Sequence, residues 1–236
     1  MIKMKFKRMK NNQKNDKKKG QIFLVCTIII IIYMLSFIGV IYELNAYQYT
    51  QAIEMEKFQS TYENFETETN NFVLALTANA TQPGTIITSN AVAAQFLQDW
   101  LDFAEKEIIT KGYAAFFDID ELSPTLPVEI VNVNTRVGFR ANIDVYMKSN
   151  YMTIDTQFSY NFNYIISYVN TATNARITFR FENQFGVKYI GYAIVTVNNL
   201  ATTDWNNGTY IYSSPLVAGN IIRAISLEQI RVRYTV

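Results

Sequence analysis

The sequence contains no histidine and only one cysteine among its 236 residues. Histidine is the most common general base and metal ligand, so its absence removes the side chain on which many catalytic and metal sites depend. The single cysteine, Cys26, cannot form an intramolecular disulfide or a cysteine-based metal site. The nine glycines are scattered and match no phosphate-binding loop. We therefore expect no enzyme activity and no bound cofactor or metal.

One group of acidic side chains remains as a candidate for chemistry. It consists of Asp99, Asp102, Glu105 and Glu107, with Lys106 among them. Hard cations need several oxygens that converge on one point, and acid–base catalysis needs carboxylates held in distinct environments. The pattern shows neither feature, so we interpret the group as the solvated face of a helix.

Charge is distributed very unevenly along the chain. Nine of the 21 lysines and arginines lie in residues 1–19, whereas only one of the 20 acidic residues does. Clustered lysines can bind nucleic acid phosphates. Here they stand directly before a long apolar run, where they act as a topology signal and contact anionic lipids. We expect no nucleic acid partner.

The apolar run covers residues 20–42 and carries no charged side chain. As a helix that rises about 1.5 Å per residue, it matches the roughly 30 Å hydrocarbon thickness of a bilayer. The basic leader then keeps the amino terminus in the cytoplasm and the rest of the chain outside. The residues that we assign to the membrane anchor are Ile22, Phe23, Leu24, Val25, Ile30, Leu35, Ile38 and Tyr42.

A cleaved secretory signal peptide is the alternative to an anchor that stays in place. Its apolar region is usually only about 7–15 residues long and ends at a small-x-small cleavage site. The run here is longer, and residues 43–47, Glu-Leu-Asn-Ala-Tyr, make a poor site. An uncleaved anchor is therefore favoured, with Cys26 as an ordinary packing residue within it.

The junction Lys18-Lys19-Gly20-Gln21 resembles the class III signal peptide of type IV pilins, and the archaeal pilin-like variants most closely. The resemblance covers about residues 15–45. It implies that a prepilin peptidase cuts after Gly20 and leaves Gln21 as the mature terminus. It also implies a pilus-assembly machinery and self-association through the amino-terminal helix. In one respect the chain departs from the bacterial pattern: the fifth mature position, a docking glutamate there, is Val25 here.

A helical repeat continues beyond the span, from residue 44 to residue 76, without a helix breaker. Its apolar stripe, spaced by steps of three and four, consists of Met55, Phe58, Tyr62, Phe65, Thr69, Phe72 and Leu76. Single surface helices normally bury one such stripe against their own protein, which is the favoured interpretation. A seam between neighbouring subunits is the other. Acidic residues between the stripe positions should face water.

A second helix should follow the Pro83-Gly84 turn that ends this stem. Ser89 or Asn90 can cap its start, and Gly112 is a suitable stop. The two helices could form an antiparallel hairpin.

Beyond the Pro-containing segment 123–127, the pattern changes to alternation with a period of two. The predicted strands cover residues 128–133, 137–147, 158–168, 175–181, 187–197, 209–213, 221–227 and 229–236. The predicted fold is α+β. It has a leader (1–20), a transmembrane helix (21–42), a helical stem and hairpin (43–122), and an antiparallel, β-sandwich-like head with an immunoglobulin-like outline (123–236).

Several surface features of the head are weaker candidates for a function. Tyr210 and Tyr212 beside Trp205 could bind a partner or glycan if exposed, although covering the sheet is the more common role. The final strand could pair with another subunit, but its arginines are typical of protected edges. Asn79 and Asn207 match the glycosylation pattern Asn-x-Thr. The alternative to a pilin-like protein is a bitopic protein that displays an immunoglobulin-like ligand-binding head and is neither processed nor polymerised.

Overall fold

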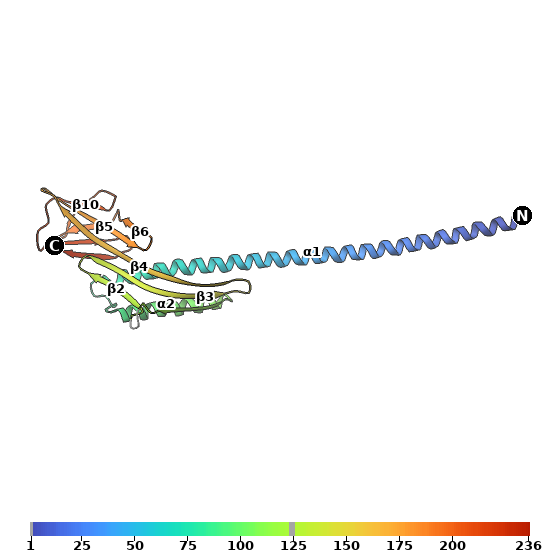
Figure 1. Ribbon diagram of the computed structural model, residues 1–236, viewed down its shortest axis with the longest axis horizontal. Coiled ribbons are helices and arrows are strands. Elements are labelled where there is room, and N and C mark those ends of the chain that lie inside the picture. The colour runs from blue at the N-terminus through green and yellow to red at the C-terminus, as the bar shows by residue number, and fades with distance from the viewer. Residues whose placement is uncertain (1, 123–125) are drawn as a thin grey trace. The chain divides into compact units, whose positions relative to one another are not determined.

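The computed structural model describes the backbone of residues 2–122 and 126–236, and side chains from residue 23 onward within these ranges (Figure 1). Helix α1 (Ile2–Ala80) is the longest element, and α2 (Asn90–Thr110) follows it. The chain divides into two compact units, Met1–Glu56 and Lys57–Val236, which we describe separately. The last turns of α1, residues 57–80, belong to the second unit.

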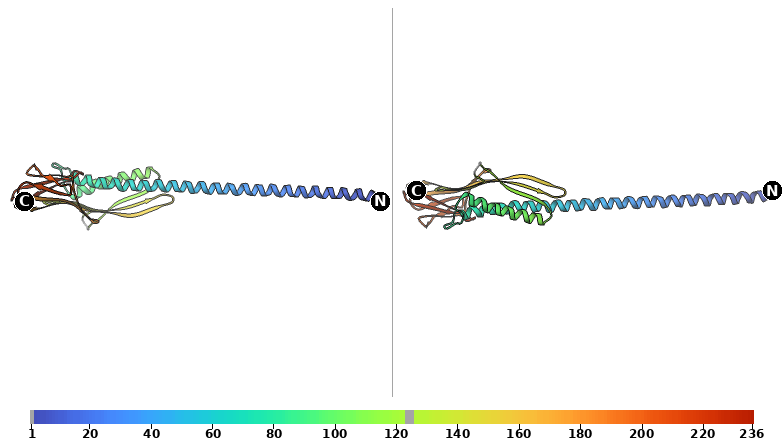
Figure 2. Two further views of the ribbon diagram at one scale, coloured as in Figure 1. Left: turned by 90° about the horizontal axis from the view of Figure 1, so that it is seen from above. Right: turned by 90° about the horizontal axis from the view of Figure 1, so that it is seen from below.

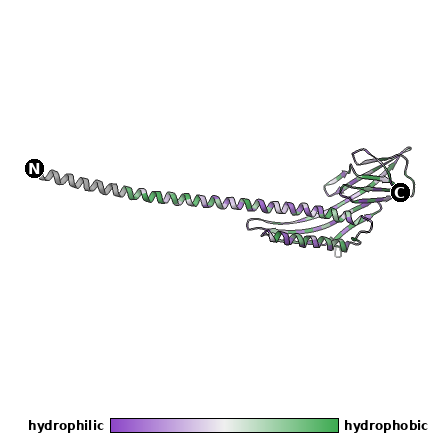
Figure 3. Ribbon diagram, turned by 180° about the vertical axis from the view of Figure 1, so that it is seen from behind, coloured by the Kyte–Doolittle hydropathy of each residue, from purple (hydrophilic) through white to green (hydrophobic). Residues whose placement is uncertain are grey.

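The first unit is helical, and none of its residues from 23 to 50 is buried. Among the described residues, α1 is the one helix long and apolar enough to cross a membrane. Figure 3 shows its apolar stretch in green. The hydroxyl groups of Thr27 and Ser36 donate to the carbonyl oxygens of Phe23 and Ile32 at 2.9 Å, so these two groups are satisfied within the helix. These properties suit a membrane anchor.

In the second unit, α1 and α2 form the predicted helical hairpin. The Trp100 ring stacks on Phe72 at a centroid distance of 5.2 Å, and its indole N–H donates to the Thr69 hydroxyl at 3.3 Å. The Ser89 hydroxyl caps α2 by accepting from the Val92 N–H, as the sequence predicts. Gly112 follows the C-cap with a φ of 90°, a conformation that favours glycine.

The strands of the described residues form two antiparallel sheets. The eight-stranded sheet has the order β1-β3-β4-β5-β10-β9, with β2 paired to β3 and β6 to β5. The four-stranded sheet has the order β12-β11-β7-β8. The strand bounds are β1 Ala114–Asp120, β2 Val128–Val133, β3 Arg136–Lys148, β4 Thr153–Asn170, β5 Ala175–Asn183, β6 Gly186–Tyr189, β7 Ile194–Val197, β8 Leu200–Ala201, β9 Thr203–Asp204, β10 Thr209–Tyr212, β11 Ile221–Ile225 and β12 Arg231–Thr235.

The structure confirms the α+β class and most of the predicted strands, with three differences. The predicted strand 187–197 is two strands, β6 and β7, because Gly191 and Tyr192, the latter at a φ of 60°, break the extended backbone between them. Strands β1, β8 and β9 were not predicted, and residues 123–125 of the predicted boundary 123–127 lie outside the described residues. The immunoglobulin-like sandwich is not confirmed, since helices rather than a second sheet cover part of the large sheet (Figure 2).

Part of the core of the second unit lies between the helices and strands β1, β3 and β4, and the core continues to β5, β10 and the four-stranded sheet. Phe65 stacks on Phe117 with ring centroids 4.1 Å apart and an angle of 9° between the rings. Phe58 meets Tyr113 edge to face, and Phe65 also stacks on Phe158. Phe58, Phe65, Thr69 and Leu76 of the predicted stripe are buried. The interpretation that the stripe packs against the protein's own head is therefore confirmed for residues 58–76.

At the margins of the sheets, two asparagine side chains make the hydrogen bonds that the backbone of a neighbouring strand would make. The Asn134 carboxamide accepts from the Thr235 N–H at 2.9 Å and donates to its carbonyl oxygen at 3.2 Å. Asn170 makes the same pair of bonds with Leu216. Each carboxamide presents one donor and one acceptor, as a neighbouring strand would. Chain segments that lack a strand partner are thereby held in place.

Strand β12 lies at an edge of the four-stranded sheet, where it is partly closed. Asn134 occupies the backbone groups of Thr235, and the Arg231 N–H donates to the Thr81 hydroxyl at 3.0 Å. Arg231 and Arg233 are exposed, whereas Val232 is buried. The strand thus has one solvent-exposed and one buried face, as expected of a protected edge strand.

Candidate functional site

The predicted processing residues Lys18, Lys19, Gly20 and Gln21 lie within α1, but their side chains, like that of Ile22, are outside the described residues. The remaining anchor residues can be placed. All of them are exposed: Phe23, Leu24, Val25, Ile30, Leu35, Ile38 and Tyr42. Cys26 is exposed on the same stretch. The anchor thus presents apolar side chains that the described protein does not cover.

The acidic residues of α2 are on its outer face, and Asp99, Asp102 and Glu107 are exposed. Asp99 and Asp102 each accept a hydrogen bond from the glutamine one turn earlier, Gln95 and Gln98, at 2.8 Å. Such pairs support an exposed helix surface. Their arrangement fits the solvated-face interpretation.

Neither tyrosine of the candidate binding set is exposed, since Tyr212 is half-buried and Tyr210 is buried, which fits the favoured interpretation that such residues cover the sheet. Tyr210 is buried, and its hydroxyl donates to the Ile190 carbonyl oxygen at 2.8 Å and accepts from the Ala193 N–H at 2.9 Å. Alternation along β10 could not reveal this burial, because the loop that covers Tyr210 lies about twenty residues earlier in the chain. Trp205 is exposed, with the Arg176 guanidinium 5.8 Å from its ring centre.

Both matches to the glycosylation pattern are exposed. Asn79 lies in the last turn of α1, and its side-chain oxygen accepts from the Thr85 hydroxyl at 3.0 Å. Asn207 lies in the turn before β10, and its side-chain oxygen accepts from the Thr209 N–H at 3.0 Å.

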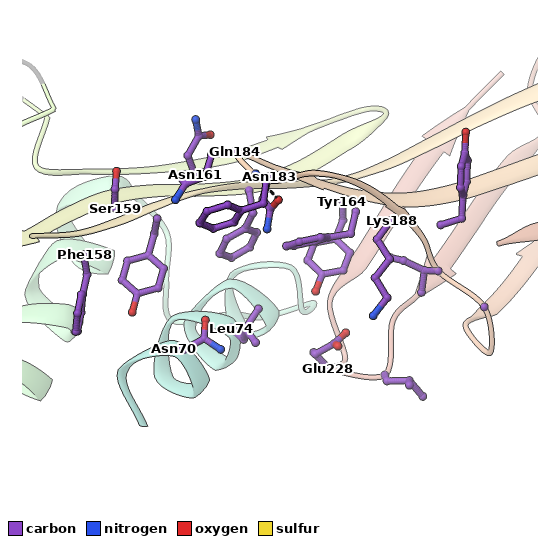
Figure 4. A pocket seen from close by; sticks show the side chains of 18 of the residues that line it. Asn70, Leu74, Phe158, Ser159, Asn161, Tyr164, Asn183, Gln184, Lys188 and Glu228 are labelled. Carbon is purple, nitrogen blue, oxygen red and sulfur yellow. Dashed lines mark hydrogen bonds between the residues drawn. The ribbon is translucent and has the colours of Figure 1, made fainter. Parts of the chain in front are cut away.

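A groove of about 860 Å³ in the second unit is the main feature that sequence reasoning missed (Figure 4). Its floor is the polar side of α1, where Glu66, Asn70 and Leu74 follow one another at helical spacing. One wall is strand β4, and the turn between β5 and β6 also lines the groove. The turn between β11 and β12 contributes Glu228. The elements that meet here are distant in sequence.

Aromatic rings and hydrogen-bonding groups alternate along the groove. Phe158, Tyr160, Phe162 and Tyr164 come from the same face of β4, since residues two apart in a strand point the same way. The charged side chains of the lining are Glu66, Glu228 and Lys188. In Figure 4, Lys188 points toward Glu228. The groove thus combines apolar walls with donors and acceptors at its margins.

Two tyrosine hydroxyl groups of the groove are held protonated. Burial, followed by the negative charge of Glu66, raises the pKa of Tyr160. Burial, followed by the negative charge of Glu228, raises the pKa of Tyr164. Both hydroxyl groups therefore remain hydrogen-bond donors throughout the neutral and moderately alkaline range.

No protein-family model, no curated protein and no solved structure matches this chain.

Proposed function

We propose that the protein is a single-pass, membrane-anchored cell-surface protein, a type IV pilin-like subunit of a filament or adhesion structure, without catalysis. One observation carries the proposal: residues 23–42 of α1 form an apolar helical stretch with every side chain exposed. Apolar surface on this scale requires a lipid bilayer or other apolar helices as its environment. The bilayer is its primary partner.

The basic leader sets the orientation in this proposal. Nine lysines and arginines before the span keep the amino terminus in the cytoplasm, so the unit Lys57–Val236 lies outside the cell membrane. Lys18, Lys19, Gly20 and Gln21 would be read by a prepilin peptidase on the cytoplasmic side. After cleavage the helix would remain as anchor and, with an assembly machinery, as the contact between subunits.

The second candidate is a bitopic protein that keeps its leader and displays a ligand-binding, immunoglobulin-like head. The groove between α1 and β4 favours this candidate, because an open groove with aromatic and polar lining suits ligand binding. The two candidates share the anchor and differ in whether the chain is cut after Gly20.

The amino-terminal residue of the membrane-extracted protein distinguishes the two candidates. We expect mass spectrometry to find Gln21 at the terminus of the wild-type protein and an uncut leader in a Gly20→Trp variant. Gly39→Trp is the matched control, since no atom lies within 4 Å of a side chain built at Gly39, and it should be cut normally. An intact leader in the wild-type protein would refute pilin-like processing and leave the bitopic candidate.

A further inference from the structure

Strand β4 continues well beyond the strand beside it. Its residues 153–165 pair with β3, whereas β5 pairs only with residues 162–170. In Figure 1 the β3–β4 hairpin extends past the ends of β5 and β6. Residues 153–161 of β4 therefore form an open edge on the side where β5 has ended.

The direction of the backbone groups along this edge follows from one bond. The Ile166 N–H donates to the Thr135 carbonyl oxygen just before β3, so even-numbered residues of β4 direct their backbone groups toward β3. Odd-numbered residues direct theirs to the other side. On that side β5 pairs with Asn163 and Ile165, but no described strand continues alongside Asp155, Gln157 and Ser159, which pair with β3 alone. Their N–H and C=O groups form a row open to a further strand.

The groove lies directly beside this row. Gln157, Phe158, Ser159, Tyr160 and Asn161 line it. Its floor on α1 can support the side chains of an added strand, and the β5–β6 turn stands where β5 would have continued. A strand that entered here would thus find both backbone partners and side-chain contacts, the two components of recognition by strand addition.

Two acidic side chains beside the open edge have no ion-pair partner, whereas Arg140, which donates to the Asn161 side chain, is paired with Glu129. Glu66 lies on the floor and Asp155 on the edge, and both are exposed. The ion pairs of the described residues, Arg140–Glu129 and Arg180–Glu182, involve neither. Lys188 is the one basic residue of the lining, and it points toward Glu228 at the other end. The floor near Tyr160 is left with an uncompensated carboxylate.

We propose that the open edge of β4 at residues 155–161 binds an extended strand from a partner protein, with a lysine or arginine of that strand facing Glu66. Backbone pairing with Gln157 and Ser159 supplies the register, and Phe158 and Leu74 receive the apolar side chains that alternate with the basic ones. The proposal holds whether or not the leader is cleaved, because it depends only on the unit Lys57–Val236.

A suitable probe for the full-length protein in detergent is a synthetic peptide with threonine at every second position and lysine and valine in turn at the positions between, so that lysine and valine share one face of the strand. We expect saturable binding and slower hydrogen exchange at the backbone N–H groups of Gln157 and Ser159. Binding to side chains alone would not slow these two amides. A peptide with glutamate in place of lysine should bind more weakly, and the Glu66→Gln variant should lose most of that preference.

Ser159→Pro tests the backbone row directly. It removes an N–H that points away from β3, a position where proline is tolerated in an edge strand. We expect it to weaken peptide binding at least about tenfold, whereas Ser159→Ala, which keeps the N–H, should bind like the wild type. If the proline variant fails to fold, a backbone-methylated peptide tests the same bonds on the wild-type protein and should not bind.

Three outcomes would overturn the proposal. One is the absence of saturable peptide binding by the wild-type protein. Another is equal binding of the methylated and unmethylated peptides. The third is binding that leaves hydrogen exchange at the backbone N–H groups of Gln157 and Ser159 unchanged, which is the result expected if the groove binds its ligand, for example a glycan, through side chains alone. None of these results bears on cleavage after Gly20, so this proposal and the proposed function fail independently.

Discussion

Replacing Phe65 by alanine should strongly destabilise the unit Lys57–Val236 if the stem helix is part of that unit's own core. Phe65 is 5% exposed and stacks on both Phe117, at 4.1 Å, and Phe158, at 5.8 Å. Loss of a buried phenylalanine side chain costs about 3–5 kcal/mol in unfolding free energy, because transfer and cavity terms add. With a urea m-value of about 2–3 kcal/mol per molar, the midpoint should fall by about 1–2 M.

The assay is urea unfolding of the full-length chain in detergent, followed by tryptophan fluorescence. Trp100 is a suitable reporter because it stacks on Phe72 at the helix pair. Phe37→Ala is the matched control: Phe37 is 64% exposed in the apolar stretch, and its loss should leave the midpoint unchanged. A loss below about 1 kcal/mol in Phe65→Ala, or a midpoint that shifts with protein concentration, would show that the stripe is a seam between subunits and refute the reasoning.

Further predictions concern tyrosine ionisation, a strand margin and a turn. Burial, followed by the negative charge of Glu228, raises the pKa of Tyr164 above its ordinary 10.0. The stability that the protonated hydroxyl contributes is therefore complete below pH 10 and is lost as the pH rises through the folded-state pKa. The free energy of unfolding should therefore fall above about pH 10, by up to about 1.4 kcal/mol per pH unit for this group. The fall should be less steep in Tyr164→Phe, and equal slopes of unfolding free energy against pH in the two proteins would contradict this. Asn134→Ala should lower the free energy of unfolding by about 1–2 kcal/mol, because it removes two hydrogen bonds. Asn132→Ala, at an exposed site, should stay within about 0.5 kcal/mol of the wild type in the same urea assay. Gly84→Ala, at a φ of 73° in open space, should lower the free energy of unfolding by about 1 kcal/mol. Gly208→Ala, at a φ of 77° with its new Cβ 2.6 Å from the Cβ of Tyr189, should lower it by about 3 kcal/mol or more. Thermal melts that rank the two variants equally would contradict the geometry.

The local elements were predictable because their signals are local. The cap at Ser89 and the stop at Gly112 define α2 within a residue, and the alternation of 137–147 and 158–168 gives β3 and β4 their faces. Strand β1 was missed since Phe116 and Phe117 are adjacent, so its apolar residues do not alternate. Its pairing with β3 comes from contacts about thirty residues away in sequence.

The groove could not be predicted because no single segment contains it. The aromatic face of β4 was visible as alternation, but Glu66, Asn70 and Leu74 resembled the outer side of an ordinary helix. The open edge depends on the length difference between β4 and β5. A strand's end can be estimated from sequence, whereas its alignment with a neighbour depends on tertiary packing.

The asparagine side chains that replace strand neighbours make the head sensitive to chemical ageing. Hydrolysis of the Asn134 or Asn170 side chain, in which water adds and ammonia leaves, would turn a carboxamide that uses one donor and one acceptor into a carboxylate that only accepts. The bond to the Thr235 N–H could persist, but the carbonyl oxygens of Thr235 and Leu216 would then face a negative charge in place of an N–H donor. An aged protein would thus loosen first where β12 and the segment before β11 are held, without any change in its gene.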